Sequence, residues 1–266
     1  MDTKIVLSKP LSLEGQSDSD EHYEAPNILH RILSLFKNMR QGSDLSCFKL
    51  PPVFNMPKSQ LQCYAESVYC TSSDLLSNLN SGKTPLDRLI LVVAWSISTI
   101  RPLRFGVAPY NPTLGETHHV SKGNLNVLLE QVSHHPPVSA LHATDDKENI
   151  EMTWCHSPIS KFNGSTLVET KVHGKRQLKL QNHGETYEMS SPNLVIRILP
   201  IPGTDWVGNV SIRCQETGLV AELNYIGQSF FGFRAGRRLI KGKIFDSLSM
   251  KILYKIEGHW DSEEYY

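Results

Sequence analysis

Hydrophobic positions follow a helical period near the beginning of the 266-residue chain. Between residues 27 and 41, apolar residues recur every three or four positions with basic residues between them, which predicts an amphipathic helix. Asn27 can cap the start of this helix, and Gly42 can end it. The apolar face comprises Ile28, Leu29, Ile32, Leu33 and Phe36. The pattern fits a surface helix docked on the core, and it also fits a movable helix that contacts a membrane.

A second helical region is predicted over residues 57–101. Its last part begins at Pro85, which suits the first position of a helix, and it ends before Arg101-Pro102. The preceding residues 43–56 contain two consecutive prolines and predict an extended connection. Residues 1–26 are polar and acidic, and we expect them to form a disordered leader.

Strand-sized segments replace the helical pattern from about residue 124 onward. Segments such as NVLLEQVS, LVAELNYI and IKGKIFD alternate with turn clusters such as DDKEN and PGTD, which predicts an antiparallel meander. So many strands in one sheet curl, and closure into a barrel removes exposed edges. We therefore predict a mainly β (α+β) fold, in which N-terminal helices precede a large, incomplete antiparallel β-barrel over residues 105–261.

Composition and charge narrow the class of protein. The 27 Lys and Arg residues balance 27 Asp and Glu residues, whereas nucleic-acid-binding proteins normally carry a basic surplus. The longest apolar run, residues 89–100, is shorter than the roughly 20 residues that a membrane-spanning helix needs. Five cysteines without a C-x-x-C pair favour reduced thiols. We expect a cytoplasmic protein that does not bind nucleic acid.

Two patterns resemble catalytic or metal-binding motifs, and both are incomplete. The sequence SGKT at residues 81–84 matches the end of a phosphate-binding P-loop, but Ser77 stands where the loop requires glycine. Several histidines lie near Cys155 in the sequence, but no His-Glu-x-x-His motif is present, and adjacent histidines on a strand point to opposite faces. We predict no metal or other cofactor, with a metal-dependent hydrolase that uses the histidine pairs as an alternative.

The segment EQVSHHPP, residues 130–137, is the strongest local signal. Its two prolines cannot donate ladder hydrogen bonds, so the strand ends there and His134 and His135 lie near the rim of the barrel. Imidazoles in that position can donate hydrogen bonds to an anion. A rigid turn that carries two surface histidines is the alternative interpretation.

The chain resembles the oxysterol-binding-protein-related lipid-transfer family, of which EQVSHHPP is the fingerprint. The sequence YNPTLGET, residues 110–117, resembles the family's Asn-Pro-x-x-Gly-Glu element. The resemblance covers residues 27–261 and includes WSISTIR, GLVAELNYIGQSFFGF, KGKIF and IEGHW. As a whole the sequence is similar to a short plant member that lacks a PH domain.

This resemblance implies a non-enzymatic protein that binds a lipid and transfers it between membranes. One sterol or phospholipid would occupy the barrel tunnel beneath a lid helix, here residues 27–41. Phosphatidylinositol 4-phosphate would compete for the same space, with its head group against His134, His135 and Asn111. The implied partners are the lipid and membrane surfaces, which the protein would bind peripherally at the endoplasmic reticulum or elsewhere. A lipid sensor or scaffold without transfer activity is the alternative.

The sequence departs from the family pattern at two places. Ala108 stands where many members have lysine before the Asn-Pro element, and Arg101 and Arg104 are nearby basic residues that could replace that lysine. Family domains also continue beyond the strand that contains Gly258 and Trp260. We therefore expect this chain to lack the C-terminal part of the family domain.

Two segments outside these motifs suggest further partners. The basic stretch at residues 233–243 could dock on anionic lipid or form a solvated turn. Its cations are Arg234, Arg237, Arg238, Lys241 and Lys243. Residues 17–25, SDSDEHYEA, loosely resemble an acidic motif that binds anchor proteins of the endoplasmic reticulum. A plain disordered leader is the alternative for that segment.

Overall fold

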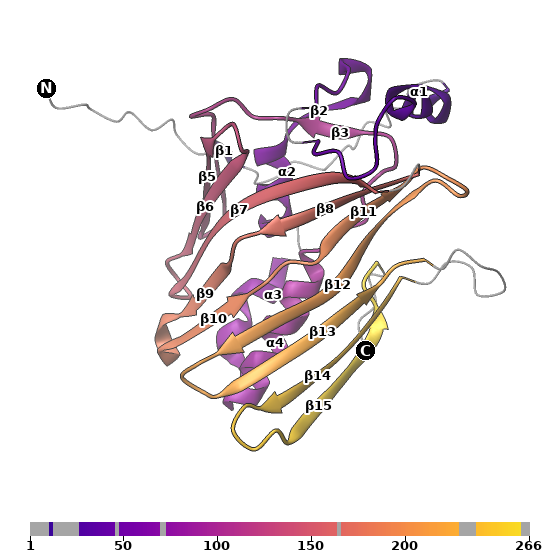
Figure 1. Cartoon of the computed structure of the whole chain (residues 1–266). Helices are drawn as coiled ribbons and strands as arrows, with labels where there is room; N and C mark the ends of the chain where they lie inside the picture. Colours follow the sequence, from indigo (N-terminus) through magenta and orange to yellow (C-terminus); the bar gives the residue numbers. More distant parts are fainter. Residues whose placement is uncertain are drawn as a thin grey trace, which may run out of the picture.

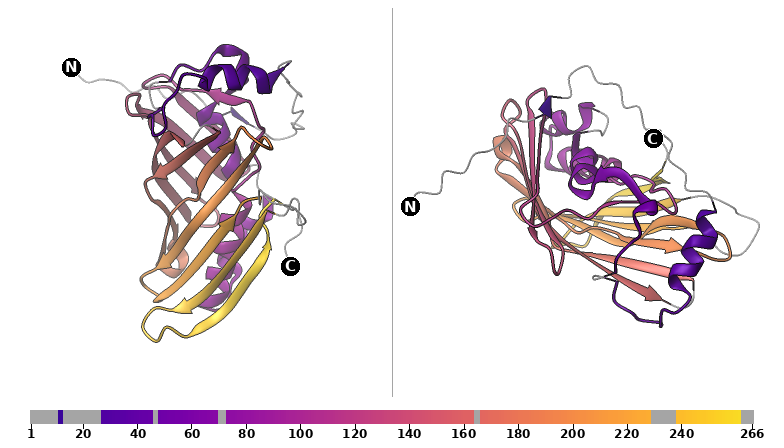
Figure 2. Two further views of the ribbon diagram at one scale, coloured as in Figure 1. Left: turned by 45° about the vertical axis from the view of Figure 1, so that its right-hand side comes forward. Right: turned by 90° about the horizontal axis from the view of Figure 1, so that it is seen from above.

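One large, mostly antiparallel sheet curls around the helices of the chain (Figures 1 and 2). The computed structural model describes residues 11–12, 27–45, 48–69, 73–163, 166–228 and 238–261. The 13 strands of this sheet are β1 (Leu11–Ser12), β4 (Thr117–Lys122), β5 (Leu125–Ser133), β6 (Val138–Asp145), β7 (Ile150–Asn163), β8 (Leu167–His173), β9 (Arg176–Leu180), β10 (Glu185–Met189), β11 (Asn193–Arg197), β12 (Gly203–Cys214), β13 (Leu219–Ile226), β14 (Leu239–Asp246) and β15 (Ile252–His259).

The sheet divides at β7, whose 14 residues are enough for two partners. Its first part pairs with β9, and its second part pairs with β8. The two branches meet again at β12, which pairs with both β10 and β11. Strands β1 and β15 lie at the two ends of the strand order, and no pairing joins them within the described residues. The predicted fold, a mainly β, incomplete antiparallel barrel, is confirmed.

Helices occupy the concave side of the sheet, as the view from above in Figure 2 shows. They are α2 (Gln60–Tyr69), α3 (Ser73–Ser77) and α4 (Pro85–Ser98), with short 3-10 turns at Pro52–Phe54 and Leu79–Ser81. Helix α4 begins at Pro85, as predicted, and Thr84 and Asp87 form a reciprocal capping box at its start. Its residues Leu89, Val92, Val93, Trp95 and Ile97 are buried in the main core, together with inward residues of the sheet.

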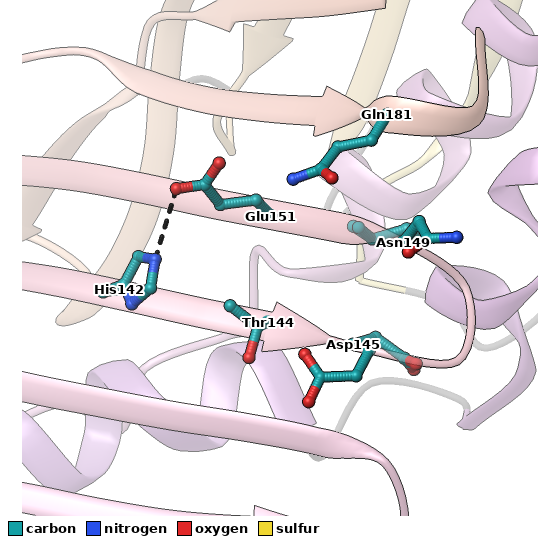
Figure 3. Close-up of a pocket in the computed structure, with 8 residues that line it drawn as sticks. His142, Thr144, Asp145, Asn149, Glu151 and Gln181 are labelled. Atoms are coloured by element: carbon teal, nitrogen blue, oxygen red, sulfur yellow. Dashed lines mark hydrogen bonds and ion pairs between the residues drawn. The ribbon is translucent and has the colours of Figure 1, made fainter. Parts of the chain in front are cut away.

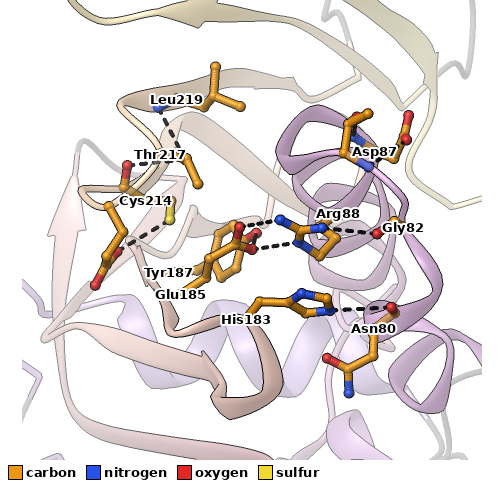
Figure 4. A network of polar contacts seen from close by, with 12 residues as sticks. Asn80, Gly82, Asp87, Arg88, His183, Glu185, Tyr187, Cys214, Thr217 and Leu219 are labelled. Carbon is orange, nitrogen blue, oxygen red and sulfur yellow. Dashed lines mark hydrogen bonds and ion pairs between the residues drawn. The ribbon is translucent and has the colours of Figure 1, made fainter.

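A buried ion pair attaches α4 to strand β10 (Figure 4). Arg88 Nε donates to Glu185 Oε2 at 2.8 Å, and the Tyr187 hydroxyl donates to the same oxygen at 2.6 Å. Burial alone would raise the pKa of Glu185, but the hydrogen bonds from Arg88 and Tyr187 outweigh it and hold that pKa below its usual value. The carboxylate therefore stays ionised and fixes the distance between helix and strand.

Helix α1 (Ile28–Phe36) packs on a second, smaller core at one end of the sheet. Phe36 stacks on Phe162 of β7 with ring centroids 5.1 Å apart, and Ile32 is buried. The helix is shorter than the predicted range 27–41. Asn27 adopts a left-handed conformation and makes no side-chain cap hydrogen bond, so the predicted cap is wrong.

Two other boundaries differ from the sequence predictions. Strand β2 (Asn55–Ser59) occupies the beginning of the region predicted as helical, because it pairs in parallel with β3 (Ala108–Tyr110). Within the leader predicted to be disordered, Leu11–Ser12 pairs with Val120 and Ser121 of β4. The rest of residues 1–26, including the segment 17–25, lies outside the described residues.

Candidate functional site

The turn between β5 and β6 carries the two histidines of the EQVSHHPP segment. Strand β5 ends at Ser133, so the histidines follow directly after it, as the prolines predict. The rings of His134 and His135 lie against each other, with centroids 4.4 Å apart and planes tilted by 58°. His134 is half-buried, whereas His135 is exposed.

The loop with the Asn-Pro element lies against this turn. His134 Nδ1 donates a hydrogen bond to the carbonyl of Pro112 at 3.0 Å. Glu116 holds the loop from within, since it accepts hydrogen bonds from the Thr113 amide at 3.0 Å and from the Ser59 hydroxyl at 2.6 Å. Asn111 is exposed next to Pro112. We call residues 110–116 and 134–137 the mouth.

The mouth presents polar groups that are not used elsewhere. Within the described part of the chain, the Asn111 side chain, both ring nitrogens of His135 and His134 Nε2 have no hydrogen-bond partner. A carbonyl only accepts, so His134 Nδ1 must carry a proton. Neutral His134 therefore offers Nε2 as an acceptor, and it can donate to an anion there only after taking up a second proton.

Ala108 lies behind the mouth, at the end of the small β2–β3 sheet. The Asn55 side-chain amide donates to the carbonyls of Ala108 and Pro109, at 3.4 and 3.2 Å. Because residue 108 is alanine, it brings no cation to the mouth. Arg101 and Arg104, predicted as possible replacements for a lysine here, are exposed on the segment that leads into β3.

A buried cation lies deeper on the concave side of the sheet. Arg176 of β9 donates to the hydroxyls of Ser96 on α4 and of Thr99 directly after it, at 2.9 and 3.2 Å, and its guanidinium lies 5.7 Å from the Trp95 ring centroid. In the described part of the chain its Nε has no hydrogen-bond partner, and burial lowers the pKa of Arg176. Within the described residues, no carboxylate pairs with this guanidinium.

His156 of β7 belongs to the same interior. Its ring stacks on Trp154 with centroids 4.2 Å apart, and Tyr64 of α2 covers both rings edge-on. Burial, assisted by the charge of Arg176, lowers the pKa of His156 to about 3. Its Nε2 has no hydrogen-bond partner among the residues that the structure describes. Sequence reasoning missed these polar residues, because their partners on α2 and α4 are about 80 to 90 positions away in the chain.

A small hollow lies on the outer side of β6 and β7, away from the mouth (Figure 3). Its volume is about 270 Å³, and most of the residues that line it have polar side chains. Within it, Glu151 accepts from His142 Nε2 at 3.3 Å and from Lys179 Nζ at 3.0 Å. Among the described residues, no group of three or more His, Cys, Asp or Glu side chains is placed to hold a metal ion.

The described cations of the basic stretch expected to face a membrane form ion pairs within the fold. Arg238, with 18% of its side chain exposed, donates to Asp205 at 3.1 Å and lies over the Trp260 ring. Lys241 and Lys243 pair with Glu257 and Glu222, at 3.0 and 3.3 Å. Arg234 and Arg237 lie outside the described residues. The expectation of a basic membrane-facing strip is therefore wrong for Arg238, whose charge points inward.

Comparison with known proteins decides the family. A family model described as "Oxysterol-binding protein" matches residues 31–266. The chain belongs to the oxysterol-binding protein family. Oxysterol-binding protein-related proteins 4B and 4C of Arabidopsis thaliana are 55% and 53% identical to it, over 97% and 98% of the chain. The resemblance found in the sequence, to a short plant member of the oxysterol-binding family, is confirmed.

Solved structures of the oxysterol-binding family have the same fold. A crystal structure of the Osh1 ORD domain with ergosterol matches 97% of this chain, with a TM-score of 0.76 and 25% identity. The Osh3 ORD of Saccharomyces cerevisiae, solved with PI(4)P, matches 85% of the chain with a TM-score of 0.67 and 22% identity. The chain spans 67% and 69% of proteins 4B and 4C, and 59% of the Osh1 domain.

No described helix of this oxysterol-binding chain combines the length and the apolar character that would let it cross a membrane.

Proposed function

We propose that this protein binds one lipid within its curled sheet and exchanges it between membranes without changing it chemically. The observation that carries the proposal is membership of the oxysterol-binding family, together with a match over nearly the whole chain to an Osh1 domain that holds ergosterol. A sterol is therefore the proposed first cargo. Phosphatidylinositol 4-phosphate is the proposed counter-ligand.

The interior and the mouth would contribute differently to this exchange. Apolar burial favours a lipid by about 0.8 kcal/mol per CH₂ group, but the donor membrane offers the same apolar surroundings. Selectivity then depends on polar contacts, and each charge-assisted hydrogen bond contributes about 1.5–3 kcal/mol. We assign the phosphorylated head group to His134, His135 and Asn111 at the mouth. The sterol hydroxyl would lie against Arg176 and its neighbours in the interior.

The first prediction separates the two ligands by mutation. The H134A/H135A variant should lose binding of phosphatidylinositol 4-phosphate and keep sterol binding, because the two histidines are assigned to the head group and Arg176 to the sterol. The matched control is H142A, which removes an exposed imidazole from the outer hollow. Binding is measured by displacement of a fluorescent sterol. Equal loss of both ligands would mean that the histidines only stabilise the turn.

The second prediction concerns the proton on His134. A phosphate that accepts a hydrogen bond from Nε2 requires a doubly protonated ring, because Nδ1 already donates to Pro112. Binding of phosphatidylinositol 4-phosphate should therefore take up a proton, measurable by calorimetry in buffers of different ionisation enthalpy. H134A should reduce this uptake. The same uptake in wild type and variant would contradict the assigned role.

Transfer and sensing are distinguished by exchange between vesicles. A transfer protein moves a labelled sterol from donor to acceptor vesicles faster when the acceptor contains phosphatidylinositol 4-phosphate, whereas a sensor binds lipid without moving it.

We propose peripheral association with the endoplasmic reticulum or other membranes, and fractionation of cells tests it. Tyr23→Ala tests the anchor segment 17–25, since unchanged binding to the anchor protein would exclude that motif.

A further inference from the structure

Strand β15 lies at the edge of the large sheet, where Figure 1 shows it beside β14. One of its edges pairs with β14, and no other strand of the described chain pairs with the second edge. The other end of the strand order differs, because β1 has only two residues there. Strand β15 has eight residues and contains no proline. An unpaired edge of this length is a template to which a further strand can add.

The free edge of β15 offers backbone groups at Lys255 and Glu257. The Trp260 amide donates to the carbonyl of Arg238 at 3.1 Å, which marks this position as a hydrogen-bonded pair with the β14 side. Hydrogen-bonded and non-hydrogen-bonded pairs alternate along antiparallel strands, and the register is regular over residues 254–259. The amides and carbonyls of Lys255 and Glu257 therefore point away from β14.

The side chains of Lys255 and Glu257 lie on the outer face of the sheet, and their charges are unequally balanced. Glu257 pairs with Lys241 on β14 at 3.0 Å. Lys255 lies opposite Lys243, which already pairs with Glu222 at 3.3 Å. Lys255 is exposed, and it forms no ion pair with any described residue. A carboxylate on a strand added beside β15 would balance this lysine.

The inner face of β15 has an apolar centre with open space beside it. Ile256 packs against the main core, and Tyr254 is 46% exposed. Gly258 lies on the same face, and a Cβ added to it would meet no described atom within 4 Å. Aromatic side chains can cover a glycine on a neighbouring strand at the edge of a sheet. An added strand with a tyrosine opposite Gly258 would fill this space.

A second copy of the same chain meets all three requirements in one register. Two β15 strands that run antiparallel about a two-fold axis at Ile256 place Lys255 of each copy opposite Glu257 of the other. The same register places Tyr254 of each copy opposite Gly258 of the other, and it brings the two Ile256 side chains together. Moving the axis by one residue would place Lys255 opposite Lys255, or Glu257 opposite Glu257, which is unfavourable.

We propose that this chain forms a dimer through β15, in which the sheet of one copy continues into the sheet of the other. The backbone groups of Lys255 and Glu257 would form the new ladder, and their side chains would set its register. The inference goes beyond the proposed function, because it does not depend on the lipid that the protein binds.

The test begins with the mass of the full chain in solution, measured by light scattering over a range of concentrations. Wild type should approach about 60 kDa at high concentration, twice the 30.0 kDa of one chain. K255E and E257K each turn two attractive pairs into repulsive ones, and each should raise the dissociation constant of the dimer about tenfold. The matched control is K175E, which reverses an exposed lysine that pairs with Glu188 far from β15 and should leave the dimer unchanged.

A mixture of the two single variants separates loss of pairing from loss of folding. When K255E pairs with E257K, each position again has an acid opposite a base, so the equimolar mixture should associate about as tightly as wild type does. The double variant K255E/E257K should dimerise with itself for the same reason. Added salt should reduce the difference between the single variants and wild type.

Amide hydrogen exchange over residues 253–259 identifies what covers the free edge. Protection that rises as the chain dimerises supports a second copy. Equal protection at concentrations where the chain is monomeric would show that another part of the same chain covers the edge, and it would overturn the inference. A mass of 30.0 kDa at every concentration, single variants that dimerise as wild type does, or a mixture that does not associate would also overturn it.

Discussion

At the scale of single residues, the interior is more polar than an apolar lipid site requires. Among the residues that the structure describes, Arg176 is buried without a carboxylate partner, and His156 is buried with one ring nitrogen that has no partner. Buried polar atoms without partners are rare in proteins and call for an explanation. A lipid hydroxyl, or a water molecule that it displaces, would satisfy them.

The third prediction uses the low pKa of His156. In the unfolded chain this histidine protonates below pH 6.5, whereas in the folded chain it stays neutral down to about pH 3. The unfolded state therefore binds the additional proton, and stability falls as the pH falls through 6.5. At pH 5 this single histidine should lower the free energy of unfolding by about 2 kcal/mol relative to its value at neutral pH.

The measurement compares wild type with H156F, which keeps an aromatic ring stacked on Trp154. Urea unfolding between pH 5 and pH 7.5 should show a smaller loss of stability for H156F on acidification. Parallel pH profiles for the two proteins would show that His156 is accessible to protons in the folded state.

Residues of the mouth could be found from the sequence, whereas those of the interior could not. The prolines of EQVSHHPP fix the position of the strand end, and therefore of the histidines, by a local rule. Arg176 lies in RQLKLQ, where alternation alone places it on one face without indicating that α4 would cover it. Only the tertiary contact with Ser96 and Thr99 identifies it as a buried cation.

At the scale of elements, helix α1 is attached to the sheet through an unusually close approach at Gly106. This glycine has φ +82°, and an added Cβ would lie 2.5 Å from the Ile28 side chain. Gly115 provides a control, because it has φ +77° but nothing within 4 Å of an added Cβ. A side chain at Gly106 or at Gly115 would carry the same free-energy cost of a left-handed backbone, but only a side chain at Gly106 would touch helix α1.

The fourth prediction follows from this pair of glycines. G106A and G115A should each lose about 1 kcal/mol of stability from the backbone, and G106A alone should also displace α1. Limited proteolysis within residues 27–41 should therefore be faster for G106A than for G115A. Equal cleavage rates would show that Ile28 yields without moving the helix.

The fifth prediction concerns the attachment of α4 to β10. R88M leaves Glu185 buried without its cation and should destabilise the protein by about 3–5 kcal/mol. The double variant R88M/E185L removes both charges and should lose less than R88M alone. Urea unfolding of both variants measures the difference, and a double variant at least as unstable as R88M would contradict the ion-pair account.

The same ion pair explains why alternation of apolar residues does not indicate strand β10 in the sequence. An inward position normally holds an apolar residue, but here Glu185 points inward and its partner lies 97 positions earlier. Long alternating segments such as LVAELNYI were predicted with the observed bounds of β13. The end of α1 was predicted too late, because the chain leaves the helix after Phe36, whose ring stacks on Phe162.

At the scale of the whole molecule, zero net charge conceals an uneven distribution. The segments 27–43 and 101–115 contain five cations and no Asp or Glu, whereas residues 17–25 are acidic. The sequence predicted membrane-facing cations at residues 233–243, and among the described ones Arg238 points inward to Asp205 while Lys241 and Lys243 pair with Glu257 and Glu222, because spacing alone does not show which cations have partners. The sheet is open, with β15 at one edge, and it surrounds the helices on one side only.

The proposed exchange requires a single site that holds either a sterol or a phosphoinositide. Native mass spectrometry of the protein after incubation with vesicles that contain both lipids tests it most directly. We predict a single bound lipid per chain, with the sterol replaced progressively as phosphatidylinositol 4-phosphate increases. A species that carries both lipids at once, or a protein that emerges with neither, would contradict the account.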